Sequence, residues 1–411
     1  MTKRTVTRAE LDTPMLPYEE AVGRVLEQVT TLPSQLVALR DARGLAIAER
    51  IVAGHDVPGF DNSAMDGYAI RSADTAGASP SSPRVLRLIE DLPAGTAPQH
   101  TVEPGTASKI MTGAPVPPGA DAVVPWEDTE PRAGEVAVLA EIPVRKHVRP
   151  RGEDLKEGDE VIAPGTVLRP VHLGVIASVG RSHVQAIPKP RVAVLSTGDE
   201  LVAAGGELAP GKVFDANQAL IAALCEEAGA SVTLTGLVGD EPKDVIGWLE
   251  DAAGMADLIV TSGGASVGEH DWLRDVLERY GELNLWRVAI KPGKPVAMGR
   301  IARAPVIALP GNPGSAFVGV HVFVAAAIRK LAGRDPAPRS MRALLTEDVK
   351  GSPSRTLFCR VRVAGTRAVP LPAQSSVVLS NIIPTEGFAI VPPGGLPAGS
   401  EVRVEFIGDG Q

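Results

Sequence analysis

The chain has few aromatic residues and almost no cysteine. Aromatic residues make up 3% of its 411 residues, which leaves little for the base-stacking surfaces that bind single-stranded nucleic acid. The two cysteines, Cys225 and Cys359, lie far apart and form no Cys-x-x-Cys pair. The sequence therefore offers no disulfide framework, and it suits a reducing cytosol. The seven histidines show no metal-ligand spacing either.

An excess of positive charge and a long apolar run are also missing. The chain carries 49 acidic and 41 basic residues, a formal net charge of -8, which argues against a general nucleic-acid surface. The most apolar expected helix, Val318–Ile328, is too short to span a bilayer and contains His321. The charged start, Met1–Arg4, is not followed by the apolar stretch of a signal peptide. We expect a cytoplasmic protein with neither a nucleic-acid nor a membrane partner.

What is present predicts several domains. A chain of 411 residues exceeds one typical hydrophobic core. Helical patterns occur at 17–29, 45–52 and 171–179, whereas short β-like runs separated by Pro and Gly dominate from 55 to 141. We expect four parts: a helical and extended linking domain (1–54 plus 142–186), a small β-rich domain (55–141), an α/β domain (187–334) and a C-terminal β-barrel domain (335–411).

The third part alternates strands and helices, which predicts a doubly wound parallel sheet. The fourth contains two runs of period two, 358–363 and 401–406, which indicate barrel strands. The fold class is thus multidomain α/β, with a central parallel-sheet domain flanked by β-rich domains. The expected elements of the sheet domain are strands at 191–195, 231–238, 258–261 and 306–309, and helices at 217–228, 244–254, 271–280 and 315–331.

The stretch Leu258–Leu273 is the most informative in the sequence. A short apolar strand ends in Ser262-Gly263-Gly264, and a helical pattern opens near Asp271. Glycine lets backbone N–H groups approach a ligand, and the helix N-terminus adds unpaired donors. Ser262 and Ser266 add hydroxyl groups. The pattern indicates a phosphate or oxyanion site, and an ordinary strand-to-helix turn is the alternative.

Two further loops follow strands of the same expected sheet, at 196–200 and 309–315. Ligands in such sheets bind beyond the carboxyl ends of the strands. Asp199 or Asp271 alone could be an ordinary helix N-cap. Several carboxylates beside an oxyanion loop would repel the ligand, however, and Mg²⁺ resolves this by bridging carboxylate and phosphate oxygens. The acids in or near these loops are Asp199, Glu200, Asp215, Asp240 and Asp271.

Lys291 and Lys294 lie in a stiff Lys-Pro-Gly-Lys-Pro turn. A solvated surface turn would explain them, but two preset ammonium groups near an acidic edge suit an incoming anion better. In the β-rich part, the loop 58–68 carries two aspartates, an Asn and a Ser between glycines, and 109–115 is another loop of small residues. Each of these loops alone is weak support for a site, because such residues are ordinary turn formers.

Taken together, the loops closely resemble the molybdopterin molybdenumtransferase family, which comprises the MoeA and gephyrin E-domain proteins. The resemblance covers most of the chain from about Leu16 to Gly333, with the motifs in family order. The C-terminal part resembles the family's β domain only loosely. The matching strings are PGFDNSAMDGYA, IMTGAPVP, RGED, LSTGDEL, SGGASVGEHD, IKPGKP and LPGNPGSA.

The resemblance implies a homodimer whose active site lies between the α/β domain of one subunit and the β-rich domain of the other. The implied reaction inserts molybdenum from molybdate into adenylyl-molybdopterin and releases AMP, assisted by Mg²⁺ or Zn²⁺. It also suggests contacts with a molybdopterin adenylyltransferase and with molybdoenzymes. Molybdate and phosphate are both tetrahedral oxyanions, and the substrate brings its own sulfurs, so no cysteine nucleophile is required.

The resemblance also implies roles for individual residues. Glu200, Asp240 and Asp271 would hold the metal or position the adenylylated phosphate. Asp66, Thr112 and Asp154 would reach in from the other subunit as further catalytic residues. The substrate-binding residues would be Ser262, Gly263, Gly264, Ser266, Lys291, Lys294, Pro310 and Pro313.

The chain departs from the family pattern at a few positions. Ala265 and Gly314 stand where the family more often has larger aliphatic residues, which indicates a packing change. Ser380–Gly387 lacks the family's usual Ala-Asn pair, so the role of the C-terminal domain stays open.

Two other functions compete: a non-catalytic molybdopterin-binding scaffold, and the adenylyltransferase step. Retention of the acids argues against the first, and the flanking β domains argue against the second.

Overall fold

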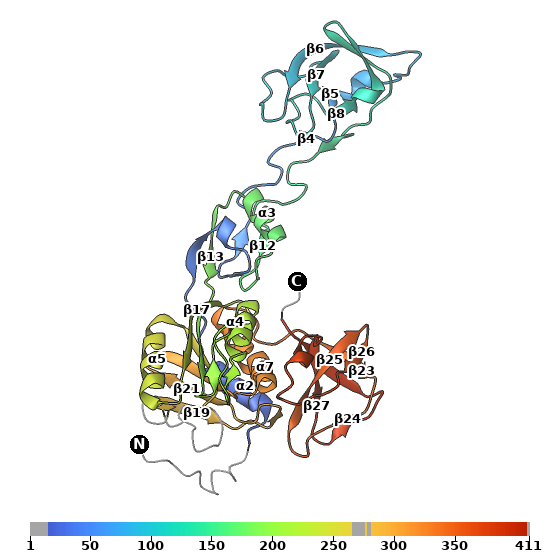
Figure 1. The fold of residues 1–411 in the computed structure, drawn as a ribbon. Helices are drawn as coiled ribbons and strands as arrows, with labels where there is room; N and C mark the ends of the chain where they lie inside the picture. Colours follow the sequence, from blue (N-terminus) through green and yellow to red (C-terminus); the bar gives the residue numbers. More distant parts are fainter. Residues whose placement is uncertain (1–14, 265–275, 278–280, 409–411) are drawn as a thin grey trace.

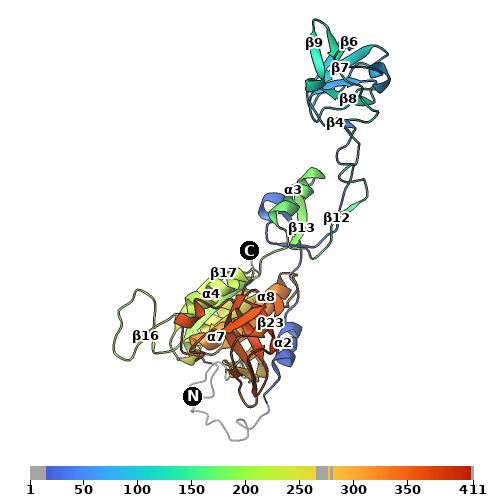
Figure 2. The same ribbon diagram turned by 90° about the vertical axis from the view of Figure 1, so that its right-hand side faces the viewer.

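The computed structural model describes residues 15–264, 276–277 and 281–408, which form an elongated molecule (Figure 1). A small β-rich unit lies at one end. An α/β body and a β-barrel lie side by side at the other end, as the perpendicular view also shows (Figure 2). A narrow segment connects the two ends. Residues that lie far apart in this arrangement cannot meet within one chain unless the molecule bends.

The β-rich unit is a six-stranded sheet in the order β8-β5-β7-β6-β10-β9. Its expected strands near 85–89, 122–124 and 136–139 are confirmed. Tyr68 and Val124 are buried on one face, Ala69 and Val123 on the other. The elements are β4 (Asn62–Ser63), β5 (Gly67–Ile70), η2 (Ser72–Thr75), β6 (Arg84–Leu92), β7 (Thr106–Ile110), β8 (Ala122–Pro125), η3 (Trp126–Asp128), β9 (Thr129–Arg132), β10 (Glu135–Val138) and β11 (Val148–Arg149), which pairs with β4.

The linking segment contradicts one expectation, because no helix forms at 45–52. Ile47 and Ile51 are four apart, which mimics a helical stripe, but both are fully buried in short strands paired with distant segments. Tertiary pairing overrides the local pattern here. The helix expected at 171–179 is confirmed. The elements are β1 (Gln35–Ala38), η1 (Leu39–Asp41), β2 (Ala46–Ile47), β3 (Ile51–Val52), β12 (Glu160–Ile162), α3 (Pro170–Ser178) and β13 (His183–Ile187).

The α/β body holds a six-stranded sheet in the order β17-β14-β18-β22-β21-β19. The first four strands are parallel, as expected. The last two strands, β21 and β19, were not expected. β21 runs antiparallel to both of its neighbours, since it turns tightly into β22 through Ala302, whose φ is +51°. The elements are β14 (Arg191–Thr197), β15 (Leu201–Val202), β16 (Val213–Phe214), α4 (Asn217–Glu227), β17 (Ser231–Val238), α5 (Pro242–Met255), β18 (Leu258–Ser262), β19 (Glu282–Trp286), β21 (Ala297–Ile301) and β22 (Ala304–Leu309).

Alternate residues of the parallel strands are buried on opposite faces of the sheet, which explains their continuous apolar runs. Ala193 and Ile259 pack with α5. Val194 and Val260 pack with α4 and with the N-terminal helix α2 (Tyr18–Glu27), in the same cluster as Phe317. The helix expected at 17–29 is thereby confirmed, and it covers the α/β body. Helices therefore line both faces, which makes this a doubly wound arrangement.

A long apolar helix follows β22. It comprises α7 (Pro313–Gly319), a π-helical turn η4 (Val320–Val324) and α8 (Ala325–Leu331). By length and composition alone, its 19 residues could cross a membrane, whereas the most apolar helix was expected to be too short to do so. However, 94% of its most apolar window is buried inside the protein. That burial is what the central helix of a folded core shows.

The C-terminal strands close into a barrel, as expected. β25 pairs with both β26 and β27, so the order β25-β26-β23-β29-β27 returns to β25. β20, which ends at the first lysine of the Lys-Pro-Gly-Lys-Pro turn, pairs in parallel with β25 and so joins the barrel to the body. The elements are β20 (Ile290–Lys291), β23 (Ser340–Leu345), β24 (Val349–Lys350), β25 (Thr356–Ala364), β26 (Arg367–Pro370), η5 (Ser380–Ile382), β27 (Gly387–Val391), β28 (Gly395–Leu396) and β29 (Glu401–Phe406).

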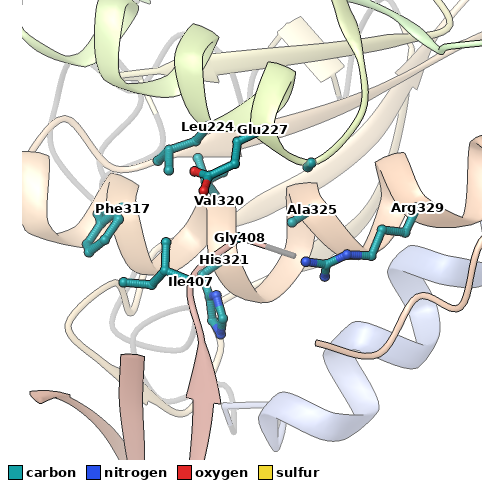
Figure 3. A pocket seen from close by; sticks show the side chains of 10 residues that line it. Leu224, Glu227, Phe317, Val320, His321, Ala325, Arg329, Ile407 and Gly408 are labelled. Atoms are coloured by element: carbon teal, nitrogen blue, oxygen red, sulfur yellow. The ribbon is translucent and has the colours of Figure 1, made fainter. Parts of the chain in front are cut away.

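A polar network of the buried residues Tyr18, His321 and Glu405 with the exposed Arg403 fastens the barrel to the helices. His321 Nε2 lies 3.1 Å from Glu405 Oε2, and Arg403 donates to Glu405 Oε1 at 2.5 Å and to the Tyr18 hydroxyl at 2.6 Å. Figure 3 shows His321 beside the end of β29, with a cavity of about 20 Å³ between β29, η4 and α4. That volume is enough for one water. The barrel is thus packed firmly against the α/β body.

Candidate active site

The loops after β14 and β17 bring two predicted metal ligands to one edge of the sheet. Asp240 N–H donates to Asp199 Oδ1 at 3.0 Å, and Asp199 N–H donates to Asp240 Oδ2 at 3.3 Å. The Glu200 carboxylate folds back over Gly198, where a Cβ would lie 2.6 Å from Glu200 Oε2. A side chain at residue 198, whose φ is +154°, would therefore displace that carboxylate. Glu200 and Asp240 therefore come from adjacent strand ends, as predicted.

Asp271, the third predicted metal ligand, lies outside the described residues, as do Ser266 and His270. Within the described ranges, no three His, Cys, Asp or Glu side chains come together as a metal site. The two carboxylates present supply the oxygen ligands that Mg²⁺ prefers. The donor chemistry thus fits a hard cation, while the three-residue set stays a prediction.

The β18 loop makes a very close approach to β14. Gly263 has a φ of +94°, and a Cβ there would lie 2.4 Å from the Thr197 carbonyl oxygen. Its N–H donates to the Leu309 carbonyl oxygen at 3.1 Å. Gly263 therefore shapes the loop, but its own N–H is already used. Gly264, with a φ of +68°, and Ser262 are the described residues of this loop that can face a ligand.

Asn217 joins the second and third loops, and the sequence reasoning missed it. Its side-chain amide donates to Ser262 Oγ and to the Gly311 carbonyl oxygen, both at 2.7 Å. Asp215 Oδ1 accepts from the Asn217 N–H at 3.0 Å and so holds the start of α4. The spacing Asp215-x-Asn217 directly before a helix was the available signal, because both residue types favour helix starts.

Buried oxygens without partners gather at this edge. The structure gives no hydrogen-bond partner to Ser196 Oγ, Thr197 Oγ1, Asp215 Oδ2, Asn217 Oδ1 or Thr261 Oγ1. Buried polar atoms are nearly always paired, and a group left unpaired costs about 1–3 kcal/mol. Five such atoms at the carboxyl ends of two adjacent strands and the start of the neighbouring helix indicate a place for a polar ligand.

The loop after β22 is held from both sides. Gly311 is fixed by Asn217, and Gly314 N–H donates to the Ser376 carbonyl oxygen of the barrel at 2.8 Å. A Cβ at Gly314 would lie 2.8 Å from that same oxygen. A side chain at residue 314 would therefore collide with the backbone of the barrel loop. Pro310 and Pro313 flank this fixed segment, and Pro313 begins α7.

The lysine turn carries more positive charge than the sequence suggested. Burial lowers the pKa of Lys294, and the nearby guanidinium groups of Arg287 and Arg355 lower it further. Lys291 lines a cavity of about 550 Å³ together with barrel residues, among them Gln374 and Ser375. Arg287 and Arg355 were not predicted, because they are distant in sequence from the turn. Clustered cations of this kind suit an oxyanion.

Two residues predicted for the opposite wall do meet in the β-rich unit. Asp66 Oδ1 accepts from both the N–H and the hydroxyl of Thr112, each at 2.7 Å. These two bonds, the backbone one first, lower the pKa of Asp66. Asp154 lies on the returning segment, where its N–H donates to the Val57 carbonyl oxygen at 3.0 Å. Thr112 thus holds Asp66 in place as a carboxylate.

This pair is remote from the sheet edge within one chain. Figure 1 places β5, β7 and β8 at the opposite end of the molecule from β17, and Figure 2 shows the same separation. The connection is stiffened by Asp61, which accepts from Arg145 at 2.5 Å and from the Arg151 N–H at 2.7 Å. One chain therefore carries two separate groups of predicted site residues.

Comparison with known proteins accounts for nearly the whole chain. Residues 16–180 match the model of the MoeA N-terminal region (domain I and II), 193–330 a probable molybdopterin binding domain, and 342–407 the MoeA C-terminal region (domain IV). Molybdopterin molybdenumtransferase 2 of Mycobacterium tuberculosis is 40% identical over 353 residues, covering 84% of this chain and 87% of that protein.

Other relatives agree. A molybdopterin molybdenumtransferase of Haemophilus influenzae is 36% identical over 84% of this chain and 85% of its own length. The crystal structure of a molybdopterin biosynthesis MoeA protein from Pyrococcus horikoshii superposes with a TM-score of 0.83 and 32% identity, covering 96% of this chain and 99% of that one. With its N-terminal, central and C-terminal regions all matched in order, the chain belongs to the MoeA family of molybdopterin molybdenumtransferases.

Proposed function

We propose that this protein inserts molybdenum from molybdate into adenylyl-molybdopterin, with release of AMP. The observation that carries the proposal is the convergence of the loops after β14, β17, β18 and β22, where Asn217 bonds Ser262 to Gly311. Glu200 and Asp240 lie on that same edge. The names of its relatives support the same reaction class.

The residues assigned to the substrate site have distinct tasks in this reaction. Ser262 and Gly264, with Ser266, hold the terminal phosphate of the pterin. Lys291 and Lys294 attract molybdate and neutralise its charge, and Pro310 and Pro313 keep the neighbouring loop rigid. Preset donors and cations of this kind lower the barrier because they need no reorganisation during the reaction.

Glu200 and Asp240, together with Asp271, would hold a divalent cation, Mg²⁺ or Zn²⁺. Such an ion supplies positive charge to the phosphoryl group that leaves with AMP. Carboxylate oxygens favour Mg²⁺ over softer metals. The Asp199–Asp240 hydrogen bonds keep the two strand-end loops in register for this task.

We further propose that the active protein is a homodimer whose partner subunit supplies Asp66, Thr112 and Asp154. Two observations support this: Thr112 holds Asp66 in place as a carboxylate, and these two residues belong to the β-rich unit, remote from the sheet edge of their own chain that carries Glu200 and Asp240. A two-fold symmetric dimer would complete two identical sites.

The division of the chain at about residues 54, 141, 186 and 334 is also a proposal. Separate hydrophobic clusters within 42–186, 68–142, 193–308 and 343–404 support it, whereas a further cluster joins α2 and the barrel residues Phe358 and Phe388 to the α/β body. A cytoplasmic location and contacts with a molybdopterin adenylyltransferase and with molybdoenzymes complete the proposal. Two free, buried cysteines are consistent with a reducing compartment.

The test is to incubate the purified protein with adenylyl-molybdopterin, Mg²⁺ and molybdate and to follow AMP by chromatography. We expect AMP to appear only when molybdate is present. Tight binding of the pterin without any AMP would overturn the proposal and would favour a scaffold function instead.

A further inference from the structure

Asn217 connects two substrate loops from a position that no ligand needs to touch. It is the first residue of α4, and 7% of its surface is exposed. One side-chain N–H reaches Ser262 Oγ and the other reaches the Gly311 carbonyl oxygen. The start of α4 is itself fixed, because Asp215 Oδ1 accepts from the N–H groups of Asn217 and Gln218. Asn217 therefore has little freedom to move.

The orientation of the Asn217 amide follows from its partners. A carbonyl oxygen can only accept a hydrogen bond, so the group that faces Gly311 O must be the NH₂ group. The same NH₂ group then faces Ser262 Oγ. The Asn217 carbonyl oxygen points elsewhere and has no partner in the described structure. The direction of the bond to Ser262 is thereby fixed.

That direction decides what the Ser262 hydroxyl can do. A serine hydroxyl has one hydrogen to donate and two lone pairs to accept with. Because Ser262 Oγ accepts from Asn217, its own hydrogen remains for another acceptor, and none occurs among the residues the structure describes. Ser262 is 2% exposed and follows a strand whose neighbouring oxygens are also unpaired. A bound phosphate oxygen is the acceptor that this geometry suits.

We propose that Asn217 is a positioning residue, which holds Ser262 as a hydrogen-bond donor to the terminal phosphate of the pterin and locks the Pro310–Pro313 loop beside it. This rests on the proposed function, because it assumes that the Ser262 loop binds that phosphate. Asn217 does not itself contact the phosphate: its effect on the phosphate passes through Ser262, whereas its bond to Gly311 fixes the neighbouring loop.

The test replaces the amide donor without changing the shape of the side chain. In Asn217→Asp, an acceptor faces Ser262, so the serine hydroxyl turns to donate to the carboxylate and is lost to the phosphate. Gln218→Glu is the matched control: the same chemical change at the next residue, whose amide donates to Gly236 O on β17 at 2.8 Å. Thermal unfolding checks that each variant is folded, and Asn217→Ala replaces Asn217→Asp if the latter is not.

The measurement is the Kd of molybdopterin by calorimetry for each variant. We expect Asn217→Asp and Ser262→Ala each to weaken binding by about tenfold to a hundredfold, since both remove one bond to a charged group. The double variant should bind no more weakly than Ser262→Ala alone, because Asn217 acts through Ser262. Gln218→Glu should bind like the wild type.

Two outcomes overturn the inference: an unchanged Kd in Asn217→Asp, or losses that add in the double variant. Failure of the proposed function looks different. Wild-type protein that binds molybdopterin with this pattern of variants, but releases no AMP, refutes the reaction and leaves the role of Asn217 intact. Conversely, AMP release by the wild type together with an unchanged Kd in Asn217→Asp refutes the role of Asn217 and leaves the proposed reaction intact.

Discussion

Asp199 and Asp240 exchange hydrogen bonds, in which the backbone N–H of each residue donates to the carboxylate of the other, at 3.3 and 3.0 Å. The exchange closes the ends of β14 and β17 against each other. A Cβ at Gly239 would lie 2.7 Å from Asp199 Oδ1, so a side chain there would push that carboxylate out of the exchange. The neighbouring Glu200 is therefore presented from a rigid frame, beside Asp240.

This arrangement predicts that Glu200→Gln and Asp240→Asn lose activity without losing the fold. Each change removes one negative oxygen ligand, and a missing electrostatic contact to a reacting group typically costs about 10²–10³ in kcat. Molybdate-dependent AMP release, measured over a range of Mg²⁺ concentrations, tests this. Glu207→Gln, an exposed residue of the next loop, is the control. Wild-type rates in both variants would contradict the metal assignment.

Lys294 predicts a pH dependence for molybdate. Its pKa is lowered by burial and by Arg287 and Arg355, so it loses its charge at a lower pH than an ordinary lysine. The affinity for the dianion should fall as the pH rises through this lowered pKa. Lys294→Arg keeps a charged group at all these pH values and should move the fall to higher pH. Identical profiles of KM for molybdate in both proteins would contradict the prediction.

The remote position of Asp66 predicts complementation between inactive variants. In a mixed dimer of Asp66→Ala and Asp240→Ala chains, one site carries both changes and the other carries neither. Random mixing of symmetric dimers should therefore restore about a quarter of the wild-type rate. The measurement is AMP release after the two variants are unfolded and refolded together. A mixture that stays inactive, while mixed dimers are present, would place the whole site in one chain.

Both cysteines should be unreactive in the folded protein. Cys225 and Cys359 are buried, and burial raises the pKa of each thiol to about 12. The reactive thiolate is therefore nearly absent at pH 8. A thiol-specific colour reagent should detect no thiol in the native protein and two after denaturation. Rapid reaction of either native cysteine would show that a thiol is available for chemistry.

Much of the fold was readable from the sequence, for a physical reason. Strands that are buried on both faces, such as 191–197 and 258–262, carry continuous apolar runs, and helical patterns in the sequence separate them; most of the helix expected at 271–280 lies outside the described residues. The antiparallel strand β21 and the edge strand β19 gave no such signal. The segment 45–52 misled, because Ile47 and Ile51 have helical spacing, whereas their pairing partners lie more than a hundred residues away.

The site was predictable only in part. Motif residues such as Glu200, Asp240 and Ser262 lie at the ends of strands or just beyond them, so topology alone brings them to one edge. Asn217 shows only the weak signal of a helix start, and Arg355 shows no local pattern. Their importance comes from contacts between loops: Asn217 with Gly311, and Arg355, whose guanidinium lies near Lys294 and bonds to the Ile290 carbonyl oxygen. Contacts of this kind appear only in three dimensions.

The most direct test of the account is the ratio of AMP released to molybdenum incorporated. Purified protein, adenylyl-molybdopterin, Mg²⁺ and molybdate are incubated together, AMP is quantified, and molybdenum bound to the isolated pterin is measured by mass spectrometry. The account predicts one molybdenum for each AMP, with neither product in the absence of molybdate. AMP release that is independent of molybdate, or a pterin product that contains no molybdenum, would contradict it.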